Sequence, residues 1–304
     1  MQPIWTWVVS GCRRSIVSAC SIGALVFTAL PTPAIVVGVP EQSVSSQGLH
    51  RIWPGPDGKP LPFQDDGEIL EFLRAAKIVS TERLPEGVTD PRQALLELDG
   101  IQVHATLKDI DETYKRERMS DGTFAMELRD YYVFEQVAYQ LAVLLGLDNV
   151  PPTVLRRYQR GENSLQLWVY GAMTENVRRE RGMRPPENMS WVRQVQTMYV
   201  FDDLIGNVDR NRGDILIDEN WKLWMVDHSR AFQTGPELRF IDNVIYCRRD
   251  LLEGLRALDE ATIKEHTGNQ LTRYQITALL GRRDAVVAHI QELIDTRGEN
   301  AVLY

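Results

Sequence analysis

Residues 201–217 read FDDLIGNVDRNRGDILI, and residues 223–232 read LWMVDHSRAF. The first stretch carries Asp209 and Asp214, five residues apart, in a loop that a glycine bounds on either side. The second stretch carries Asp227 directly after a short apolar strand. Acids that follow a helix and flank a hairpin can converge on one place. These two stretches therefore predict a site that is built from carboxylates.

Three such carboxylates suit phosphoryl transfer. Magnesium and manganese prefer oxygen ligands, and a further carboxylate is needed to orient or deprotonate the acceptor hydroxyl. A single Asp in a turn would indicate little, because Asp, Asn and Gly are common in turns of every kind. Here a helix, a loop, a hairpin and an Asp after a strand occur in the order that a kinase requires. The combination predicts a metal-dependent phosphotransferase.

The chain around this site predicts an α+β fold of two lobes. Apolar periodicity and turn residues place a mostly β region first and a mostly α region after it. The Asp99-Gly100 pair favours a two-residue hairpin turn between two of the strands. The expected strands are 76–82, 93–98, 102–109, 153–157, 165–170, 215–217 and 223–226, and the expected helices are 68–73, 130–147, 188–204, 249–258, 274–280 and 285–294.

The N-terminus has the pattern of an export signal. Two arginines precede an apolar run, and a small-x-small site follows near residue 34. This arrangement predicts a secretory signal peptide or an uncleaved membrane anchor over residues 1–34, and hence an exported (periplasmic or extracellular) or membrane-anchored protein. Residues 35–66 are rich in Gly, Pro, Ser and Gln and are expected to form a linker.

The signature region resembles a group of atypical kinases. Residues 206–211 (GNVDRN) and 226–232 (VDHSRAF) are similar to the patterns GN-x-DRH and DHG-x-x-F of the Golgi casein kinase type of secretory kinase and of the HipA-type bacterial serine kinases. The phosphatidylinositol 3- and 4-kinases have a related pattern. The resemblance implies a bilobal protein-kinase-like fold, with a small β-rich N-lobe over residues 67–172 and a helical C-lobe over residues 173–304. It implies that Asp209 is the catalytic residue and that Asp214 and Asp227 bind metal.

A second resemblance lies upstream. Residues 134–154, which contain FEQVAYQL and later VPPTV, are similar to the helix of the same families that holds an acidic residue. Glu135 would be that acid, and it would either pair with the nucleotide-binding lysine or reach the metal. Lys108 is the best candidate for the lysine, because it ends the third expected strand and precedes this helix; a kinase lysine at that place contacts the nucleotide phosphates. The implied cofactors are ATP and Mg or Mn.

The sequence also departs from the kinase pattern. A glycine-rich phosphate loop is missing, so residues 85–89 would have to cover the nucleotide. Asp214 stands where the toxin and lipid kinases have Asn, which adds a negative charge at the metal. A kinase-like protein of weak or no activity, and an enzyme of the same fold that transfers AMP, therefore remain alternatives.

Composition limits the partners. The 304-residue chain has a net charge of −8, which argues against a nucleic-acid binder. Cys12 and Cys20 lie in the expected signal, and Cys247 alone can form neither an intramolecular disulfide nor a thiolate zinc site. The expected partners are a nucleotide and a hydroxyl-bearing acceptor, whether protein, lipid or small molecule, with membrane contact only through an uncleaved N-terminal segment.

Overall fold

The computed structural model describes residues 53–56, 58–84, 91–119, 122, 124–159 and 161–304. Two expectations fall outside these residues and stay predictions: the signal or anchor in residues 1–34, and the covering of a nucleotide by residues 85–89. Within the described part, no helix combines the length and the apolar character that a membrane span requires.

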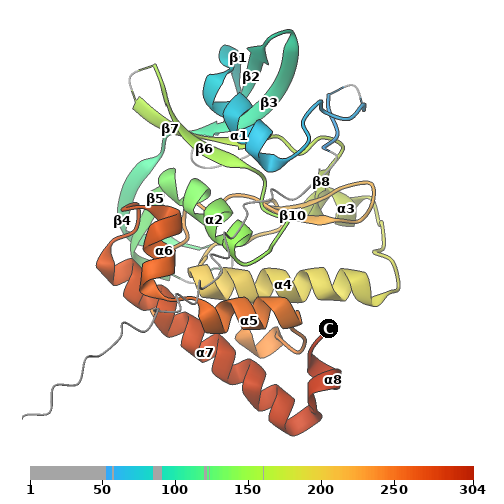
Figure 1. Ribbon diagram of the computed structural model, residues 1–304, viewed down its shortest axis with the longest axis vertical. Helices are drawn as coiled ribbons and strands as arrows, with labels where there is room; N and C mark the ends of the chain where they lie inside the picture. The colour runs from blue at the N-terminus through green and yellow to red at the C-terminus, as the bar shows by residue number, and fades with distance from the viewer. Residues whose placement is uncertain (1–52, 57, 85–90, 120–121, 123, 160) are drawn as a thin grey trace, which may run out of the picture. The chain divides into compact units, whose positions relative to one another are not determined.

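Five antiparallel strands form the N-terminal sheet, in the spatial order β1-β2-β3-β7-β6. Helix α1, Asp66–Ala75, packs on one face, where alternate strand residues such as Leu96 and Val103 are fully buried. Figure 1 shows α1 and this sheet at the top of the view and the C-terminal helices below. The structure confirms four of the expected strands, with bounds β1 Lys77–Arg83, β2 Arg92–Leu98, β3 Ile101–Lys108 and β6 Thr153–Tyr158, and it moves the strand expected over 165–170 to β7, Gly161–Leu167.

The turn between β2 and β3 has the expected form. Asp99 and Gly100 have φ angles of 52° and 79°, and the flanking residues Leu98 and Ile101 pair directly. Positive φ at both central residues is the requirement of the tight hairpin turn that an Asp-Gly pair favours. This turn fixes the register of β3 and therefore the position of Lys108 at its end.

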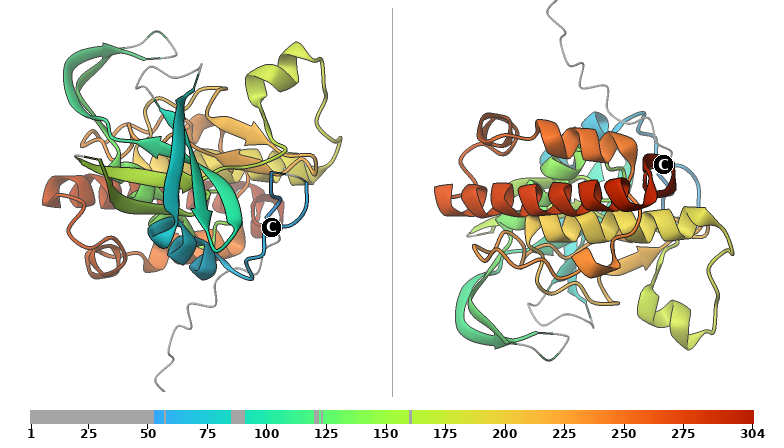
Figure 2. Two further views of the ribbon diagram at one scale, coloured as in Figure 1. Left: turned by 90° about the horizontal axis from the view of Figure 1, so that it is seen from above. Right: turned by 90° about the horizontal axis from the view of Figure 1, so that it is seen from below.

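The structure corrects the expected helix 130–147. A hairpin of β4, Asp111–Arg118, and β5, Phe124–Tyr131, comes first, and helix α2 spans only Val133–Leu144. The hairpin is a separate two-stranded sheet, and most of its residues are exposed or half-buried. Because neither face is consistently buried, the sequence lacks the alternation that reveals a strand. Figure 2 shows the two strands running outward together.

Helices form most of the C-terminal part. Asn188 caps α4, Met189–Ile205, by accepting hydrogen bonds from the backbone N–H groups of Ser190 and Trp191. The expected helices 274–280 and 285–294 are one helix, α7, whose first turn carries a capping box of Thr272 and Gln275. The remaining elements are β8 Met173–Thr174, α3 Glu175–Glu180, β9 Ile215–Ile217, β10 Leu223–Met225, the 3-10 turn Ile241–Asn243, α5 Arg249–Ala257, α6 Glu260–Thr267, α7 Arg273–Arg297 and α8 Glu299–Val302.

Gly206 ends α4 in a left-handed conformation, with φ 61°. A Cβ atom at this position would lie 2.7 Å from Cζ of Arg282, so a larger residue would clash. Arg282 comes from α7 and is fully buried, and it donates to the carbonyl oxygens of Leu204, Gln233 and Gly235. It thereby ties the end of α4 to the segment that follows β10.

The described residues between 53 and 65 form no regular helix or strand beyond an isolated bridge, but Trp53 and Leu61 anchor them in the fold, so this part is not a free linker. Trp53 is only 2% exposed, and its ring centroid lies 4.8 Å from that of Trp224. Leu61 is buried in the same core. A single tryptophan among Gly and Pro residues carries no periodic signal, which explains why the sequence pattern did not reveal this packing.

We expect Trp53→Ala to lower the free energy of unfolding by about 3–5 kcal/mol, the usual range when a large buried aromatic side chain is removed. Tyr274→Ala is the control, because Tyr274 is 78% exposed, and should change it by less than about 0.5 kcal/mol. Urea denaturation of both variants measures this difference. Equal stability of the two variants would show that residues 53–65 are not part of the core.

Candidate active site

Lys108 joins three separate segments of the chain. Its Nζ lies 2.6 Å from Oε1 of Glu135, in α2, and 2.9 Å from Oδ1 of Asp227, after β10. Burial alone would lower the pKa of Lys108, but the charges of Asp227 and Glu135 outweigh burial and raise this pKa above its ordinary value. The lysine is therefore a permanent cation that holds strand β3, helix α2 and the Asp227 turn together.

Glu135 pairs with Lys108 and also binds the backbone of His228. It is 1% exposed, and its second oxygen, Oε2, accepts a hydrogen bond of 3.0 Å from the backbone N–H of His228. Burial would raise the pKa of Glu135, but the charge of Lys108 outweighs burial and keeps this pKa well below its ordinary value. Glu135 therefore stays ionised and fixes both Lys108 and the residue after Asp227.

Asp227 is open to a ligand although its neighbours are buried. Its side chain is 40% exposed, against 7% for Lys108 and 2% for Glu135. Its φ of 59° is rare for a residue other than glycine and occurs mainly for Asp and Asn. This angle turns the chain after β10, so that the backbone N–H of His228 points at Glu135.

Asp214 lies in the loop after α4, and its Oδ2 accepts hydrogen bonds from Asn211, 3.1 Å from the backbone N–H and 2.7 Å from the side-chain amide. The backbone N–H of Val226 donates to the carbonyl of Asp214, which brings the Asp214 loop beside Asp227. Burial, and then the charge of Asp227, raise the pKa of Asp214 well above its ordinary value. Two carboxylates that repel each other in this way are a fitting donor set for a divalent cation.

These two acids would not hold a cation alone. Among the described residues, no group of three or more His, Cys, Asp and Glu side chains has the arrangement of a metal site. Mg²⁺ commonly binds through one or two carboxylates and completes its ligands with water and substrate phosphates. Asp214 and Asp227 fit that pattern, in which metal and nucleotide bind together.

Arg210 organises the backbone of this site, a role that the sequence interpretation missed. Its guanidinium donates to both oxygens of the buried Asp202, at 2.8 Å each, and to the carbonyl oxygens of Asp214 and Val226. It also lies 3.0 Å from Nε2 of His228. One buried cation therefore holds the loop of Asp214 and the strand before Asp227 against α4.

Asp209 is connected to Asp214 through Asn211, whose side-chain amide donates to the Asp209 carbonyl and to the Asp214 carboxylate, and the Asp209 carboxylate is held by Arg230. Nη1 of Arg230 donates to Oδ2 of Asp209 at 2.8 Å, and Nε of Arg230 donates to Oδ2 of Asp130 at 2.7 Å. Arg230 and Asp130 were not expected in the site. The two partners of Arg230, Asp209 and Asp130, are 21 and 100 residues away from it in sequence, so no spacing in the chain could have revealed these contacts.

No protein-family model and no curated protein matches the sequence. Solved structures do match. A hydra Fam20 protein with sugar aligns with a TM-score of 0.58 and 16% identity over 78% of this chain and 91% of that chain. The Golgi casein kinase aligns with a TM-score of 0.56 and 14% identity over 78% of this chain and 77% of that chain. The Golgi casein kinase with Mn/ADP bound aligns with a TM-score of 0.55 and 14% identity over 78% of each chain.

The chain has a protein-kinase-like fold. At 14–16% identity the likeness concerns the fold, and it confirms the α+β architecture with a β-sheet N-terminal region and a helical C-terminal region.

In this kinase-like fold, the two faces of the N-terminal sheet differ in character. Val103, Ala105 and Leu107 of β3 are buried on the face that α1 covers. Because successive strand residues point to opposite faces, His104 and Thr106 share the other face with Lys108. A nucleotide whose phosphates meet Lys108 would lie against this second, more polar face.

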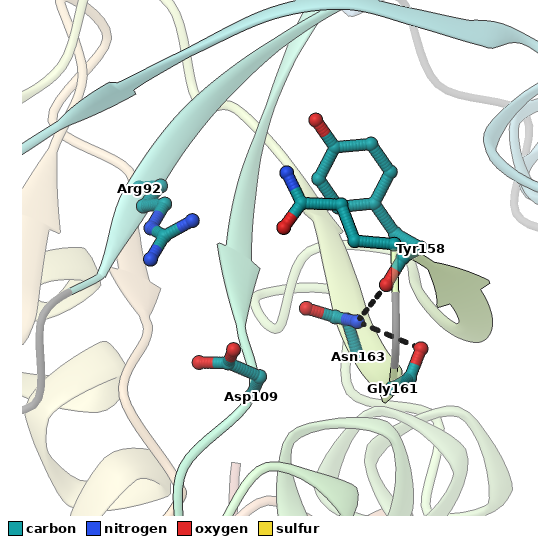
Figure 3. A pocket seen from close by; sticks show the side chains of 6 residues that line it. Arg92, Asp109, Tyr158, Gly161 and Asn163 are labelled. Carbon is teal, nitrogen blue, oxygen red and sulfur yellow. Dashed lines mark hydrogen bonds between the residues drawn. The ribbon is translucent and has the colours of Figure 1, made fainter.

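A cavity of about 520 Å³ lies elsewhere, at the ends of β3, β6 and β7. Figure 3 shows Arg92 and Asn163 in its wall, with Asn163 donating to the carbonyl oxygens of Tyr158 and Gly161. Arg92 pairs with Leu107, so both Arg92 and Asn163 point to the face opposite to Lys108. The cavity is therefore distinct from the predicted site.

Asp203 docks the segment beyond the site onto α4. Its carboxylate accepts hydrogen bonds from the backbone N–H groups of Arg239 and Phe240, at 2.7 and 3.0 Å to Oδ1. Burial raises the pKa of Asp203 from 3.8 to about 6, although these hydrogen bonds oppose the rise. Between pH 4 and pH 6 the folded protein therefore binds a proton that the unfolded chain has lost, and this part of the stability declines as pH rises.

Asp203→Asn should remove this pH dependence while its Oδ1 still accepts from Arg239 and Phe240. We expect the free energy of unfolding of the wild type, minus that of the variant, to fall by on the order of 1 to 3 kcal/mol between pH 4 and pH 6. Urea denaturation at several pH values measures this. A difference that stays constant or grows over the range would contradict a raised pKa at Asp203.

Proposed function

We propose that the protein is a metal-dependent ATP phosphotransferase that acts on a hydroxyl acceptor. The observation that carries the proposal is the junction of Lys108 with Glu135 and Asp227, at 2.6 and 2.9 Å, beside Asp214. Stability alone does not explain it, because a buried ion pair is often no more stable than an apolar replacement. The proposal also draws on the kinase-like fold and on the neighbour that has Mn/ADP bound.

Each residue has a role in this proposal. Lys108 binds the nucleotide phosphates, and Glu135 orients Lys108. Asp214 and Asp227 hold Mg²⁺ or Mn²⁺, which supplies positive charge to the phosphate oxygens. Asp209 orients the acceptor hydroxyl and accepts its proton as the terminal phosphoryl group passes from ATP to the acceptor oxygen and ADP is released.

We further propose that the enzyme works outside the cytoplasm, exported or held by its N-terminal segment. Support comes only from the pattern of residues 1–34. N-terminal sequencing of the protein recovered from membrane and exported fractions tests this. A chain that starts at Met1 in the cytoplasmic fraction would contradict it.

We expect ATP and Mn²⁺ or Mg²⁺ together to raise the unfolding temperature, because a ligand that binds only the folded state stabilises it. Asp227→Asn should weaken metal-dependent nucleotide binding by about tenfold or more. Asp295→Asn, an exposed acid on α7, is the matched control and should bind as the wild type does. Titration calorimetry gives the affinities. Absence of any nucleotide binding by the wild type would refute the proposed function.

Asp209→Asn should separate binding from turnover. We expect the rate of ATP consumption to fall by about 100-fold or more, since the general base is lost. Nucleotide affinity should stay within about threefold of the wild type, because Asp209 contacts neither Lys108 nor its two partners. Mass spectrometry of the product distinguishes phosphate transfer from AMP transfer. A wild type that binds ATP but consumes none would indicate a binding protein of kinase-like fold.

A further inference from the structure

Arg230 lies three residues after Asp227, and its guanidinium lies close to three carboxylates. Its Nη1 donates to Asp209 at 2.8 Å, and its Nε donates to Asp130 at 2.7 Å. Its Nη2 is 4.0 Å from Oε1 of Glu117. The side chain is only 11% exposed, so these contacts are largely shielded from water. A planar guanidinium suits this bridge because its N–H groups have fixed directions.

The hairpin of β4 and β5 supplies Asp130 and Glu117. Its base is attached to the segment after Asp227 by backbone contacts: the N–H of Tyr131 donates to the carbonyl of Ser229 at 2.8 Å. The amide of Gln233 accepts from the N–H of Arg129 and donates to its carbonyl, as a neighbouring strand would. Arg230 is therefore held between two segments that are fixed to each other.

The pair of Asp130 and Arg230 is costly to bury. Asp130 is 0% exposed, and burial raises its pKa although hydrogen bonds from Arg230 and Ser229 oppose the rise. A buried carboxylate of this kind contributes little to stability by itself. Asp130 and Asp209 bind the same guanidinium, that of Arg230. This indicates a different use for Asp130: it orients Arg230, and Arg230 orients Asp209.

We propose that Arg230 is a positioning residue for Asp209, and that the β4–β5 hairpin sets its position through Asp130. The proposal rests on the proposed function, because it concerns the aspartate that would receive the acceptor hydroxyl. The hairpin, which lies in the chain between Lys108 and Glu135, would then connect the acceptor side of the site to the nucleotide side. Displacement of the hairpin would misalign Asp209 without touching the nucleotide.

The test uses ATP itself as the probe, with water or the protein as acceptor. Arg230→Met should lower the rate of ATP consumption by about tenfold to 100-fold, because a small misplacement of a reacting group has effects of this size. Nucleotide affinity should stay within about threefold. Arg230→Lys should recover part of the rate, since it retains the charge but not the two fixed N–H directions. Asp130→Asn should give a smaller loss of rate than Arg230→Met.

The matched control is Arg129→Ala. It removes an exposed ion pair with Asp111 from the same hairpin and leaves the backbone contacts with Gln233 possible. We expect wild-type turnover from it. Wild-type turnover by Arg230→Met would overturn the inference, and so would an equal loss of rate and of nucleotide affinity, which indicates a general structural role. A wild type that neither binds nor consumes ATP would instead refute the proposed function.

A double-mutant cycle tests the bridge independently of turnover. The unfolding effects of Asp130→Asn and Asp209→Asn should be non-additive when Arg230 is present and additive in Arg230→Met, because Arg230 hydrogen-bonds to both acids. Additive effects in both backgrounds would show that no bridge exists, whatever the activity of the wild type.

Discussion

The site depends on one buried ammonium group. Lys108 ends a strand of the N-terminal sheet, Glu135 lies in the first turn of α2, and Asp227 follows a strand of the C-terminal part. A charge that is removed from water must have partners, so the chain cannot bury Lys108 without bringing both acids to it. This requirement couples the packing of the sheet, the helix and the Asp227 turn in one place.

Two arginines extend the same principle. Arg210 connects α4 to the loop of Asp214 and to the residue before Asp227, and Arg230 connects Asp209 to Asp130. The whole chain is acidic, with a net charge of −8, yet three buried cations, Lys108, Arg210 and Arg230, lie at these acids or at the segments that carry them. Lys108 pairs with Glu135 and Asp227, and Arg230 pairs with Asp209, whereas Asn211 holds the carboxylate of Asp214. That arrangement keeps carboxylates in fixed positions at a site where their mutual repulsion would otherwise separate them.

Local patterns in the sequence predicted much of this structure. Strands β2 and β3 alternate in burial, and the Asp99-Gly100 turn and the Asn188 cap depend only on adjacent residues, so the sequence reveals them directly. Of the five candidate site residues, Lys108, Asp209, Asp214 and Asp227 were found from their order along the expected strands and loops together with the resemblance to atypical kinases, and Glu135 was found from the resemblance alone. The structure brings Lys108, Glu135 and Asp227 into direct contact and places Asp214 beside them, whereas Asp209 is connected to Asp214 through the side chain of Asn211.

Features that depend on distant residues escaped prediction. The β4–β5 hairpin is largely exposed and therefore lacks an alternating pattern, and Trp53 stands alone in a Gly- and Pro-rich stretch. The pair of Asp130 and Arg230 joins residues 100 positions apart, which only the folded chain brings together. The sequence identified the acids and Lys108, but it did not reveal that Arg210 and Arg230 hold the surrounding segments together.

The most direct measurement is a crystal structure with Mn²⁺ and a non-hydrolysable ATP analogue, recorded at a wavelength where manganese scatters anomalously. The account requires an anomalous peak in bonding contact with the carboxylates of Asp214 and Asp227, with the analogue's phosphates against Lys108. A nucleotide that binds instead in the cavity of Arg92 and Asn163, or a manganese peak away from both aspartates, would contradict it.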